Sequence, residues 1–319
     1  MVASKVIGVG AYLPEKIVTN NDLAQTLETS DEWIRSRVGI AKRHIAAEGE
    51  LTSHLAIKAA RLALEHAQIT PEAIDLVIVA TTTPDYTFPA TAALVQTALG
   101  IPPCAAFDVQ AVCSGFIYAL NTADMYIKSG QSTCALVIGA ETMSRLLDWT
   151  DRSTCVLFGD GAGAFILKAT DSKDTSRILG TKLYADGAFK DALYTQGGAS
   201  QGHFGTLHMN GKEVFKAAVV NMAKAIDCVL ADHHVKDADI DWVVPHQANQ
   251  RIIEGLAERL KLPMDKVIST IAEHANTSAA TIPLAFDVAV KDGRIKRGDV
   301  IVMPAMGGGF TWGATLMVY

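Results

Sequence analysis

The segment EAIDLVIVATTTPD, residues 72–85, recurs later in the chain as ADIDWVVPHQANQ, residues 238–250. In this alignment Ile74 lies over Ile240, and each copy follows a stretch with the apolar periodicity of a long helix. Ordered self-similarity within one chain indicates a duplicated structural unit. We therefore predict that the chain consists of two similar halves.

A second match supports the duplication. LVIGA, which ends at Ala140, aligns with IVMPA, which ends at Ala305, and a glycine-rich turn closes each half. This match has an offset of 165 residues, which places Cys113 over Ser278. We predict a first half of residues 1–172 and a second half of residues 173–319, divided in the polar segment TDSKDTS. A pseudo-twofold arrangement would then bring the segments AVC and HAN close together.

The strand-like segments are continuously apolar, as in strands that are covered on both faces. They are KVIGVGA at 5–11, LVIVATT at 76–82, CALVIGA at 134–140, WVVPHQ at 242–247 and DVIVMPA at 299–305. Residues 51–68, 115–130 and 211–233 instead repeat apolar side chains at three- and four-residue spacing, which predicts amphipathic helices. The predicted fold class is α/β, with layered sheets and helices.

Composition excludes several classes of protein. No apolar run approaches the roughly 18 residues that a membrane helix needs, and the first residues do not form a secretory leader, so we expect a cytoplasmic protein with no membrane partner. The five cysteines have no metal-ligand spacing, and their odd number fits a reducing compartment, so we expect no structural metal. A net charge of -6 argues against nucleic acid as a partner.

Cys113 is the first candidate for chemistry. It lies in AVCSG, residues 111–115, where an apolar strand pattern gives way to a helical one. At a helix N-terminus, free backbone N–H groups and the helix dipole would lower the thiol pKa, and the same N–H groups could bind an oxyanion. The alternative is a packed, inert thiol.

Two further candidates lie in the second half. His246 ends the apolar segment WVVP at the carboxyl edge of a predicted sheet, where α/β folds bind ligands. Asn276, in EHANTSAA, resembles a helix N-cap. Each of the two also fits a purely structural role. Together with Cys113 they suit acyl transfer through a thioester, because N–H donors near a thiol stabilise the charge that develops on a carbonyl oxygen.

Six sequence motifs are spread in order over almost the whole chain: TSDEWI, AVCSGF, FGDGAGA, VPHQAN, NTSAA and GGGFTWG. Together they resemble the motifs of β-ketoacyl-acyl carrier protein synthase III from bacterial type II fatty-acid synthesis. That family belongs to the thiolase superfamily, so the resemblance implies a duplicated five-layer αβαβα fold. It also implies an acyltransferase that condenses an acyl-CoA primer, expected to be acetyl-CoA, with malonyl-acyl carrier protein. The products would be 3-oxoacyl-acyl carrier protein, CoA and CO2, and no metal or organic cofactor would be needed.

The resemblance assigns roles to the reacting groups. Cys113 would attack the acyl-CoA and hold the acyl group. His246 Nε2 and the Asn276 amide would donate hydrogen bonds to the enolate oxygen that forms when malonyl-acyl carrier protein loses CO2. The backbone N–H groups of Cys113 and Gly308 would form a second oxyanion hole, for the acyl carbonyl.

The resemblance also implies binding residues. The CoA site would comprise Thr29, Trp33, Arg37, Arg152, Phe215, Ala248 and Asn249, with the adenine between Trp33 and Arg152. The carrier protein would dock on Lys216, Arg251, Arg259 and Lys261. Phe88 would reach into the acyl pocket of a partner subunit, which implies a homodimer. Two positions depart from the family pattern: Ala275 stands where glycine is frequent, and Met306 where phenylalanine is frequent.

The sequence argues against some other classes of protein and leaves two alternatives open. The glycine-rich segments match neither a phosphate-binding loop nor a dinucleotide fingerprint, which argues against a dehydrogenase. A thiol hydrolase would lack the duplicated halves. Two alternatives stay open: a condensing enzyme of secondary metabolism that uses a longer or aromatic primer, and a non-catalytic protein that binds the carrier protein.

Overall fold

The computed structural model describes residues Met1–Tyr319 and contains two large β-sheets. The first sheet has the strand order β1-β7-β6-β4-β5 and the second the order β11-β12-β13-β8. The strands of the first sheet are β1 Val2–Tyr12, β4 Leu76–Ala80, β5 Ala105–Val109, β6 Cys134–Thr142 and β7 Asp160–Asp171. Those of the second are β8 Arg177–Ala185, β11 Trp242–Val243, β12 Val300–Gly307 and β13 Thr311–Val318.

The two sheets share one pairing pattern. β4 runs parallel to β6, with Leu76 opposite Ala135, and β11 runs parallel to β12, with Trp242 opposite Ile301, so both strands of the pair are repeated after 166 residues. Each sheet continues with two antiparallel pairings. In the first sheet β6 pairs with β7 and β7 with β1, and in the second sheet β12 pairs with β13 and β13 with β8. The predicted duplication is confirmed.

The predicted offset of 165 residues between LVIGA and IVMPA is wrong by one. At the observed offset of 166, Ser278 is equivalent to Val112 and not to Cys113. Both residues have a left-handed φ, 49° at Val112 and 51° at Ser278, and both begin a 3-10 turn, Val112–Ser114 and Ser278–Ala280. The alignment of LVIGA with IVMPA rests on two identities, Val137 with Val302 and Ala140 with Ala305, and neither is kept at the observed offset. Two identities in a five-residue apolar string are too few to set the register.

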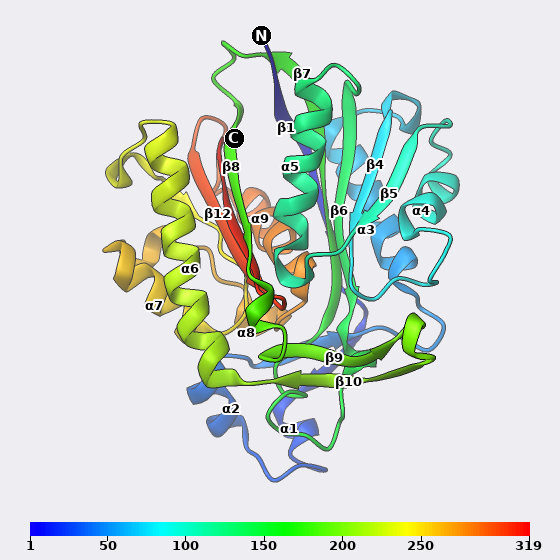
Figure 1. Cartoon of the computed structure of the whole chain (residues 1–319), viewed down its shortest axis with the longest axis vertical. Helices are drawn as coiled ribbons and strands as arrows, with labels where there is room; N and C mark the ends of the chain where they lie inside the picture. The colour runs from blue at the N-terminus through cyan, green and yellow to red at the C-terminus, as the bar shows by residue number, and fades with distance from the viewer.

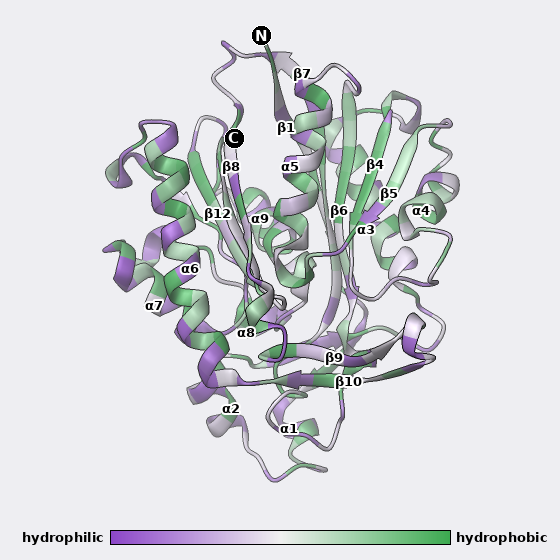
Figure 2. Cartoon of the chain, viewed as in Figure 1, coloured by the Kyte–Doolittle hydropathy of each residue, from purple (hydrophilic) through white to green (hydrophobic).

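Helices separate and cover the sheets in five layers (Figure 1). The central layer holds α5 and α9, and the outer layers hold α3 with α4 and α6 with α7. Their bounds are α3 Thr52–Ala67, α4 Thr91–Leu99, α5 Gly115–Lys128, α6 Gly211–Asp232, α7 Gln250–Leu260 and α9 Thr281–Lys291. This αβαβα arrangement confirms the predicted fold class. Figure 2 shows both hydrophobic and hydrophilic residues on α6 and α7. Such amphipathic helices bury one side against a sheet and expose the other to water, which fits their outer position.

Smaller elements surround this frame. They are β2 Lys16–Thr19, α1 Asn20–Leu23, α2 Asp31–Val38, β3 Lys42–Ile45, β9 Leu193–Gly198, β10 His203–Met209 and α8 Ile271–His274. The chain passes from the first sheet to the second between Asp171 and Arg177, and the division at residues 172/173 stays a prediction. None of the helices has both the length and the apolar character needed to span a membrane.

One aromatic row joins the central layer to the first sheet. Phe116 of α5, Phe165 of β7 and Phe286 of α9 contact one another edge to face, with ring centres 4.9 and 4.8 Å apart. All three side chains are fully buried. The row therefore anchors both central helices on the same strand, which places the starts of α5 and α9 next to each other.

The strand predicted at 242–247 is regular only over Trp242–Val243. Pro245 has no backbone N–H and cannot continue the ladder. The segment nevertheless follows β12, because the Val244 N–H donates to the Val302 carbonyl and the His246 N–H to the Pro304 carbonyl, both at 2.9 Å. These bonds fix where His246 leaves the edge of the second sheet.

Each half also holds the turn that precedes the central helix of the other half. A Cβ on Gly139 of β6 would lie 2.4 Å from the Ala279 carbonyl oxygen, and a Cβ on Gly307 of β12 would lie 2.6 Å from the Cys113 nitrogen. Only glycine permits these approaches. The two turns therefore lie against the opposite sheets, close to the pseudo-twofold axis.

Candidate active site

The structure brings the three candidate residues together at one cavity. Cys113, His246 and Asn276 all line a space of about 510 Å3. Their exposed fractions are 4%, 2% and 5%, so bulk water has little access to any of them. They come from the turn before α5, the end of the segment beside β12, and the turn after α8.

Cys113 lies in the 3-10 turn directly before α5, as predicted. Burial raises the pKa of its thiol to about 12, and this effect outweighs the lowering by the Ser278 hydroxyl and by the backbone N–H of Cys113 itself. The predicted lowering of the thiol pKa is therefore wrong for the enzyme without substrate. The thiolate loses more hydration in this enclosed site than the neighbouring N–H and O–H groups restore.

His246 is neutral in this site, because burial lowers its pKa to about 3. Its Nδ1 lies 2.7 Å from the Thr281 hydroxyl oxygen. Nε2 makes no hydrogen bond within the protein, and the side chain lines the cavity. The imidazole thus has one nitrogen held by the protein and the other available to a ligand.

Asn276 is held at its oxygen. Its Oδ1 accepts a hydrogen bond from the Ser278 backbone N–H at 2.9 Å, which leaves the amide NH2 group as the end available to a ligand. The predicted helix N-cap is wrong, because the N-cap of the 3-10 turn Ser278–Ala280 is Thr277 and that of α9 is Ala280. Asn276 lies one residue before Thr277, and its bond to the Ser278 N–H closes a local turn between residues two apart. Asn276 also follows helix α8 rather than a strand, and its backbone pairs with Phe158.

The sequence motifs did not indicate Glu141, a buried carboxyl group next to the turn that carries Ser278. It accepts hydrogen bonds from the Thr82 backbone N–H at 3.0 Å, the Thr83 hydroxyl at 2.7 Å and the Ser278 hydroxyl at 3.0 Å. Burial raises its pKa despite these donors. The sequence did hold one signal for this residue, because Glu141 directly follows the apolar run CALVIGA, where a charged side chain is unusual. Glu141 ties the turn that carries Asn276 to the first sheet.

Five of the predicted binding residues line the same cavity: Arg37, Phe215, Ala248, Asn249 and Arg251. Asn249 also caps α7, with its Oδ1 accepting the Arg251 backbone N–H at 2.8 Å. The Arg251 guanidinium lies 5.9 Å from the Phe215 ring centre. Lys212, which the motifs did not indicate, adds another cation to the cavity lining.

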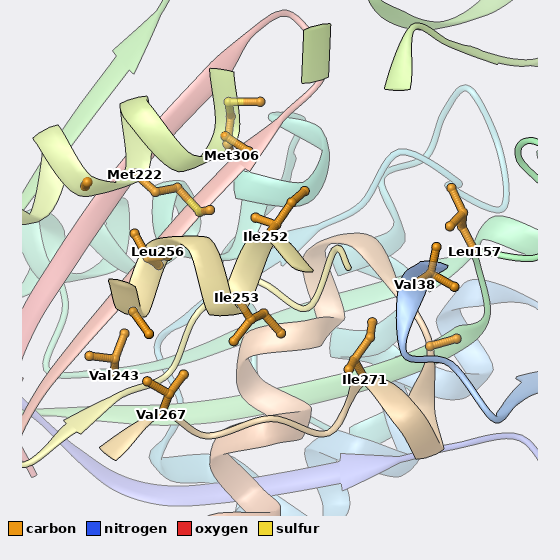
Figure 3. Close-up of a cluster of buried hydrophobic side chains, with 14 of the residues drawn as sticks. Val38, Leu157, Met222, Val243, Ile252, Ile253, Leu256, Val267, Ile271 and Met306 are labelled. Carbon is orange, nitrogen blue, oxygen red and sulfur yellow. The ribbon is translucent and has the colours of Figure 1, made fainter. Parts of the chain in front are cut away.

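Apolar side chains form most of the cavity wall, and apart from Phe215 and Ala248 they were not predicted as site residues. Val38, Leu157, Met222, Ile252 and Met306 belong to the second sheet's buried cluster and also line the cavity (Figure 3). In Figure 3 the Met222 side chain extends from α6 toward Ile252 of α7. Such residues have the spacing of ordinary core positions, so a sequence does not reveal that one side of them is open.

The predicted adenine site has its two members in contact. The Arg152 guanidinium carbon lies 4.7 Å from the centre of the Trp33 ring. Arg152 also donates a hydrogen bond to the Glu28 carbonyl, and the Thr29 hydroxyl has no partner in the protein. A base stacked between two planar groups needs about 7 Å between them, so the contact leaves no room for an adenine there. The predicted arrangement, with the adenine between Trp33 and Arg152, is absent from this structure and requires one of the two side chains to move.

Other predicted residues do not line the cavity. They are Thr29, Trp33, Phe88, Arg152, Lys216, Arg259, Lys261 and Gly308. Gly308 is buried and follows Gly307, which does line the cavity. The cations Lys216, Arg259 and Lys261 are exposed, and Phe88 is 84% exposed.

The backbone conformation at Ala275 explains why glycine is frequent at this position in the family pattern. Its φ is 58° and its ψ is -165°, a conformation that glycine adopts without steric strain. The alanine is fully buried and adopts the same conformation, at a cost of roughly 1–3 kcal/mol. The hydrogen bonds on both sides, from Ala275 N–H to Ile271 and from Asn276 N–H to Leu157, hold it there.

The raised pKa of Cys113 predicts how its reactivity depends on pH. Because the thiolate is the nucleophile, the rate of alkylation by iodoacetamide should rise by about tenfold for each pH unit between pH 7 and pH 9. Intact mass and peptide mapping measure this rate, and Cys113→Ser identifies the peptide. A rate that levels off below pH 8 would contradict the raised pKa.

Comparison with known proteins agrees with this geometry. The family model described as 3-oxoacyl-[acyl-carrier-protein (ACP)] synthase III matches residues 107–187, and the model of the C terminal part of that family matches residues 230–319. A protein of Paramagnetospirillum magneticum named β-ketoacyl-[acyl-carrier-protein] synthase III is 59% identical over 99% of both chains.

Solved structures show the same likeness. The crystal structure of 3-oxoacyl-[acyl-carrier-protein] synthase III from Aquifex aeolicus has a TM-score of 0.94 and 50% identity, and covers 99% of this chain and 100% of that one. The priming β-ketosynthase of the R1128 polyketide pathway has a TM-score of 0.93 at 34% identity, over 99% of this chain and 96% of that one. The chain therefore belongs to the β-ketoacyl-acyl carrier protein synthase III family of acyltransferases.

Proposed function

We propose that Cys113, His246 and Asn276 catalyse the decarboxylative condensation of an acyl-CoA primer with malonyl-acyl carrier protein, the step that initiates type II fatty-acid synthesis. One observation carries the assignment of roles. A thiol, an imidazole and a primary amide from distant segments line one largely apolar cavity. The amide, fixed at its oxygen, presents N–H groups to that cavity.

The first half-reaction loads the primer. Cys113 Sγ forms a bond to the acyl carbon, the bond between that carbon and the CoA sulfur breaks, and the thiol proton ends on CoA. The carbonyl oxygen lies at the backbone N–H groups of Cys113 and Gly308 during attack. Burial that disfavours the free thiolate also protects the neutral thioester from water.

The second half-reaction forms the carbon–carbon bond. Malonyl-acyl carrier protein loses CO2, and the electron pair of the broken bond becomes an enolate on the thioester. His246 Nε2 and the Asn276 amide donate hydrogen bonds to the enolate oxygen. The enolate carbon attacks the acyl carbonyl, and the expelled Cys113 thiolate takes up a proton. Decarboxylation itself creates the carbanion, so the proposed reaction uses no metal or organic cofactor.

The binding residues divide by the part of the substrate that they contact. Trp33 and Arg152 hold the CoA adenine, with Thr29 and Arg37 nearby, while Phe215, Ala248 and Asn249 contact the pantetheine arm. The carrier protein, which has no adenine, docks on the cations Lys216, Arg251, Arg259 and Lys261. Support comes from the adjacency of Trp33 and Arg152, one of which has to move to admit the base, and from the exposure of these four cations.

Acetyl-CoA is the proposed primer. The alternative, a longer or aromatic primer in secondary metabolism, draws on the likeness to the R1128 priming ketosynthase at 34% identity. The chain is more similar to relatives named β-ketoacyl-[acyl-carrier-protein] synthase III, with 54–59% identity over nearly the full chain. We further assign the enzyme to the cytoplasm, with no nucleic acid or membrane as a partner, and its five free cysteines fit a reducing compartment.

A homodimer is the proposed assembly. β5 is the edge of the first sheet, and its Asp108 carboxylate accepts the backbone N–H groups of Thr91 and Ala92 at the start of α4. Three residues before Thr91, Phe88 is 84% exposed, and Phe204 is 77% exposed. Open strand edges and exposed aromatic rings are covered in stable proteins, and a second copy of the chain would cover both.

Native mass spectrometry of the purified chain should give twice the 34.0 kDa mass of one chain. Phe88→Glu places a charge in the proposed interface and should increase the fraction of single chains, while Glu48→Lys, at an exposed site elsewhere, should not. A wild-type protein that is entirely monomeric at micromolar concentration would refute the dimer.

Incubation with acetyl-CoA should add one acetyl group to each wild-type chain and none to Cys113→Ser, as read by intact mass. A chase with malonyl-acyl carrier protein should remove the adduct and yield acetoacetyl-acyl carrier protein. An adduct only with a longer or aromatic acyl-CoA would support the alternative primer. No adduct with any primer would refute the acyltransferase proposal.

Arg152→Ala and Arg251→Ala should separate the two substrates. Arg152 is exposed, so loss of the adenine contact should raise KM for acetyl-CoA about two- to fivefold, the size of an exposed cation–π contact, and leave KM for malonyl-acyl carrier protein unchanged. Arg251→Ala should chiefly raise KM for the carrier protein. Arg61→Ala, an exposed arginine on α3, serves as the control. Equal effects of both variants on both KM values would contradict the division.

A further inference from the structure

We propose that Thr281 is a positioning residue that holds His246 in the tautomer with the proton on Nε2. This inference rests on the proposed role of His246 as a hydrogen-bond donor to the enolate. Thr281 is the first residue of α9, is 2% exposed, and does not line the cavity. It acts on the substrate only through the imidazole.

The Thr281 hydroxyl has one proton and two neighbouring acceptors. Its oxygen lies 2.7 Å from His246 Nδ1 and 3.0 Å from the Ser278 carbonyl oxygen. That carbonyl already accepts the backbone N–H of Thr281, so it does not need the hydroxyl proton. The shorter distance is also the usual length of a bond donated by a hydroxyl, whereas imidazole N–H donors mostly lie nearer 2.9 Å.

A hydrogen bond donated by the Thr281 hydroxyl to Nδ1 determines whether Nε2 carries a proton. A neutral imidazole carries one proton, so an Nδ1 that accepts a hydrogen bond requires the proton to be on Nε2. Nε2 is the nitrogen without a partner in the protein. His246 would then present an N–H group to the cavity before the malonyl group arrives, and no proton has to move when the enolate forms.

The same turn prepares both donors. The Ser278 backbone N–H binds Asn276 Oδ1 at 2.9 Å and so turns the amide NH2 toward the cavity, and three residues later the Thr281 hydroxyl sets the imidazole. Ser278 is fixed in turn by its bond to Glu141 and by its left-handed backbone. In the other half, Gly115 is equivalent to Thr281 at the offset of 166 and has no hydroxyl. Of these two equivalent positions, only the one in the second half has a hydroxyl group.

The tautomer can be observed directly. Protein with 15N-labelled histidine should show, in long-range 1H–15N correlation spectra, a protonated Nε2 and an unprotonated Nδ1 for His246. The signals of His246 are identified as those that His246→Asn lacks. A protonated Nδ1 in the wild-type protein would overturn the proposal, whatever the activity of the preparation.

Two substitutions test the catalytic consequence. Thr281→Val keeps the shape and removes the hydroxyl, and Thr281→Ser keeps the hydroxyl. Thr91→Val is the matched control, because Thr91 is fully buried and its hydroxyl has no partner. The two half-reactions are followed separately by intact mass, as formation of acetyl-Cys113 and as its discharge by malonyl-acyl carrier protein.

The expected result is a split between the half-reactions. Thr281→Val should slow discharge about tenfold or more, whereas loss of an oxyanion donor altogether costs on the order of 10²–10³. Formation of acetyl-Cys113 should change by less than about threefold, and Thr281→Ser should restore discharge. Equal slowing of both steps, or a serine variant as slow as the valine variant, would reduce Thr281 to a packing role. If the wild-type protein forms no acyl adduct, the proposed function fails, while the spectrum still decides the tautomer.

Discussion

The reciprocal contact between each sheet and the turn of the opposite half is the constraint on which the site depends. Gly139 of the first half lies against the Ala279 carbonyl, and Gly307 of the second half lies against the Cys113 nitrogen. Neither turn could approach so closely if these positions carried a side chain. The thiol and the two donors come from different halves, so this contact, rather than any local motif, sets their relative positions.

Burial sets the charge state of the two ionisable candidates in the cavity, Cys113 and His246. The same desolvation raises the pKa of Cys113 to about 12 and lowers that of His246 to about 3, so the pair is neutral before substrate binds. The neutral pair does not repel the malonyl carboxylate, and Arg37, Lys212 and Arg251 add positive charge to the cavity lining. Catalysis in such a site depends on dipoles that are already oriented, which is why the bonds of Asn276 to Ser278 and of His246 to Thr281 matter.

The motifs predicted the polar residues of the cavity better than their surroundings. Cys113, His246 and Asn276 line one cavity, whereas Trp33 and Arg152 contact each other and leave no space for the adenine predicted between them. The apolar wall of Met222 and Ile252 has the periodicity of a buried core, and Glu141 lies in an apolar strand run. The lowered thiol pKa was inferred from the helix N-terminus alone, because the depth of burial is not a local property of the chain.

The sequence by itself determined the duplicated α/β architecture, the family and the candidate side chains Cys113, His246 and Asn276, because these depend on repeated apolar patterns and on residue types in short motifs. Only the tertiary structure decided the register of the two halves, the protonation of Cys113 and His246, and the hydroxyl that faces Nδ1. Each of these depends on which groups from distant segments come within a few ångströms of one another. That proximity follows from the packing of the two sheets on their shared central helices, which local sequence does not encode.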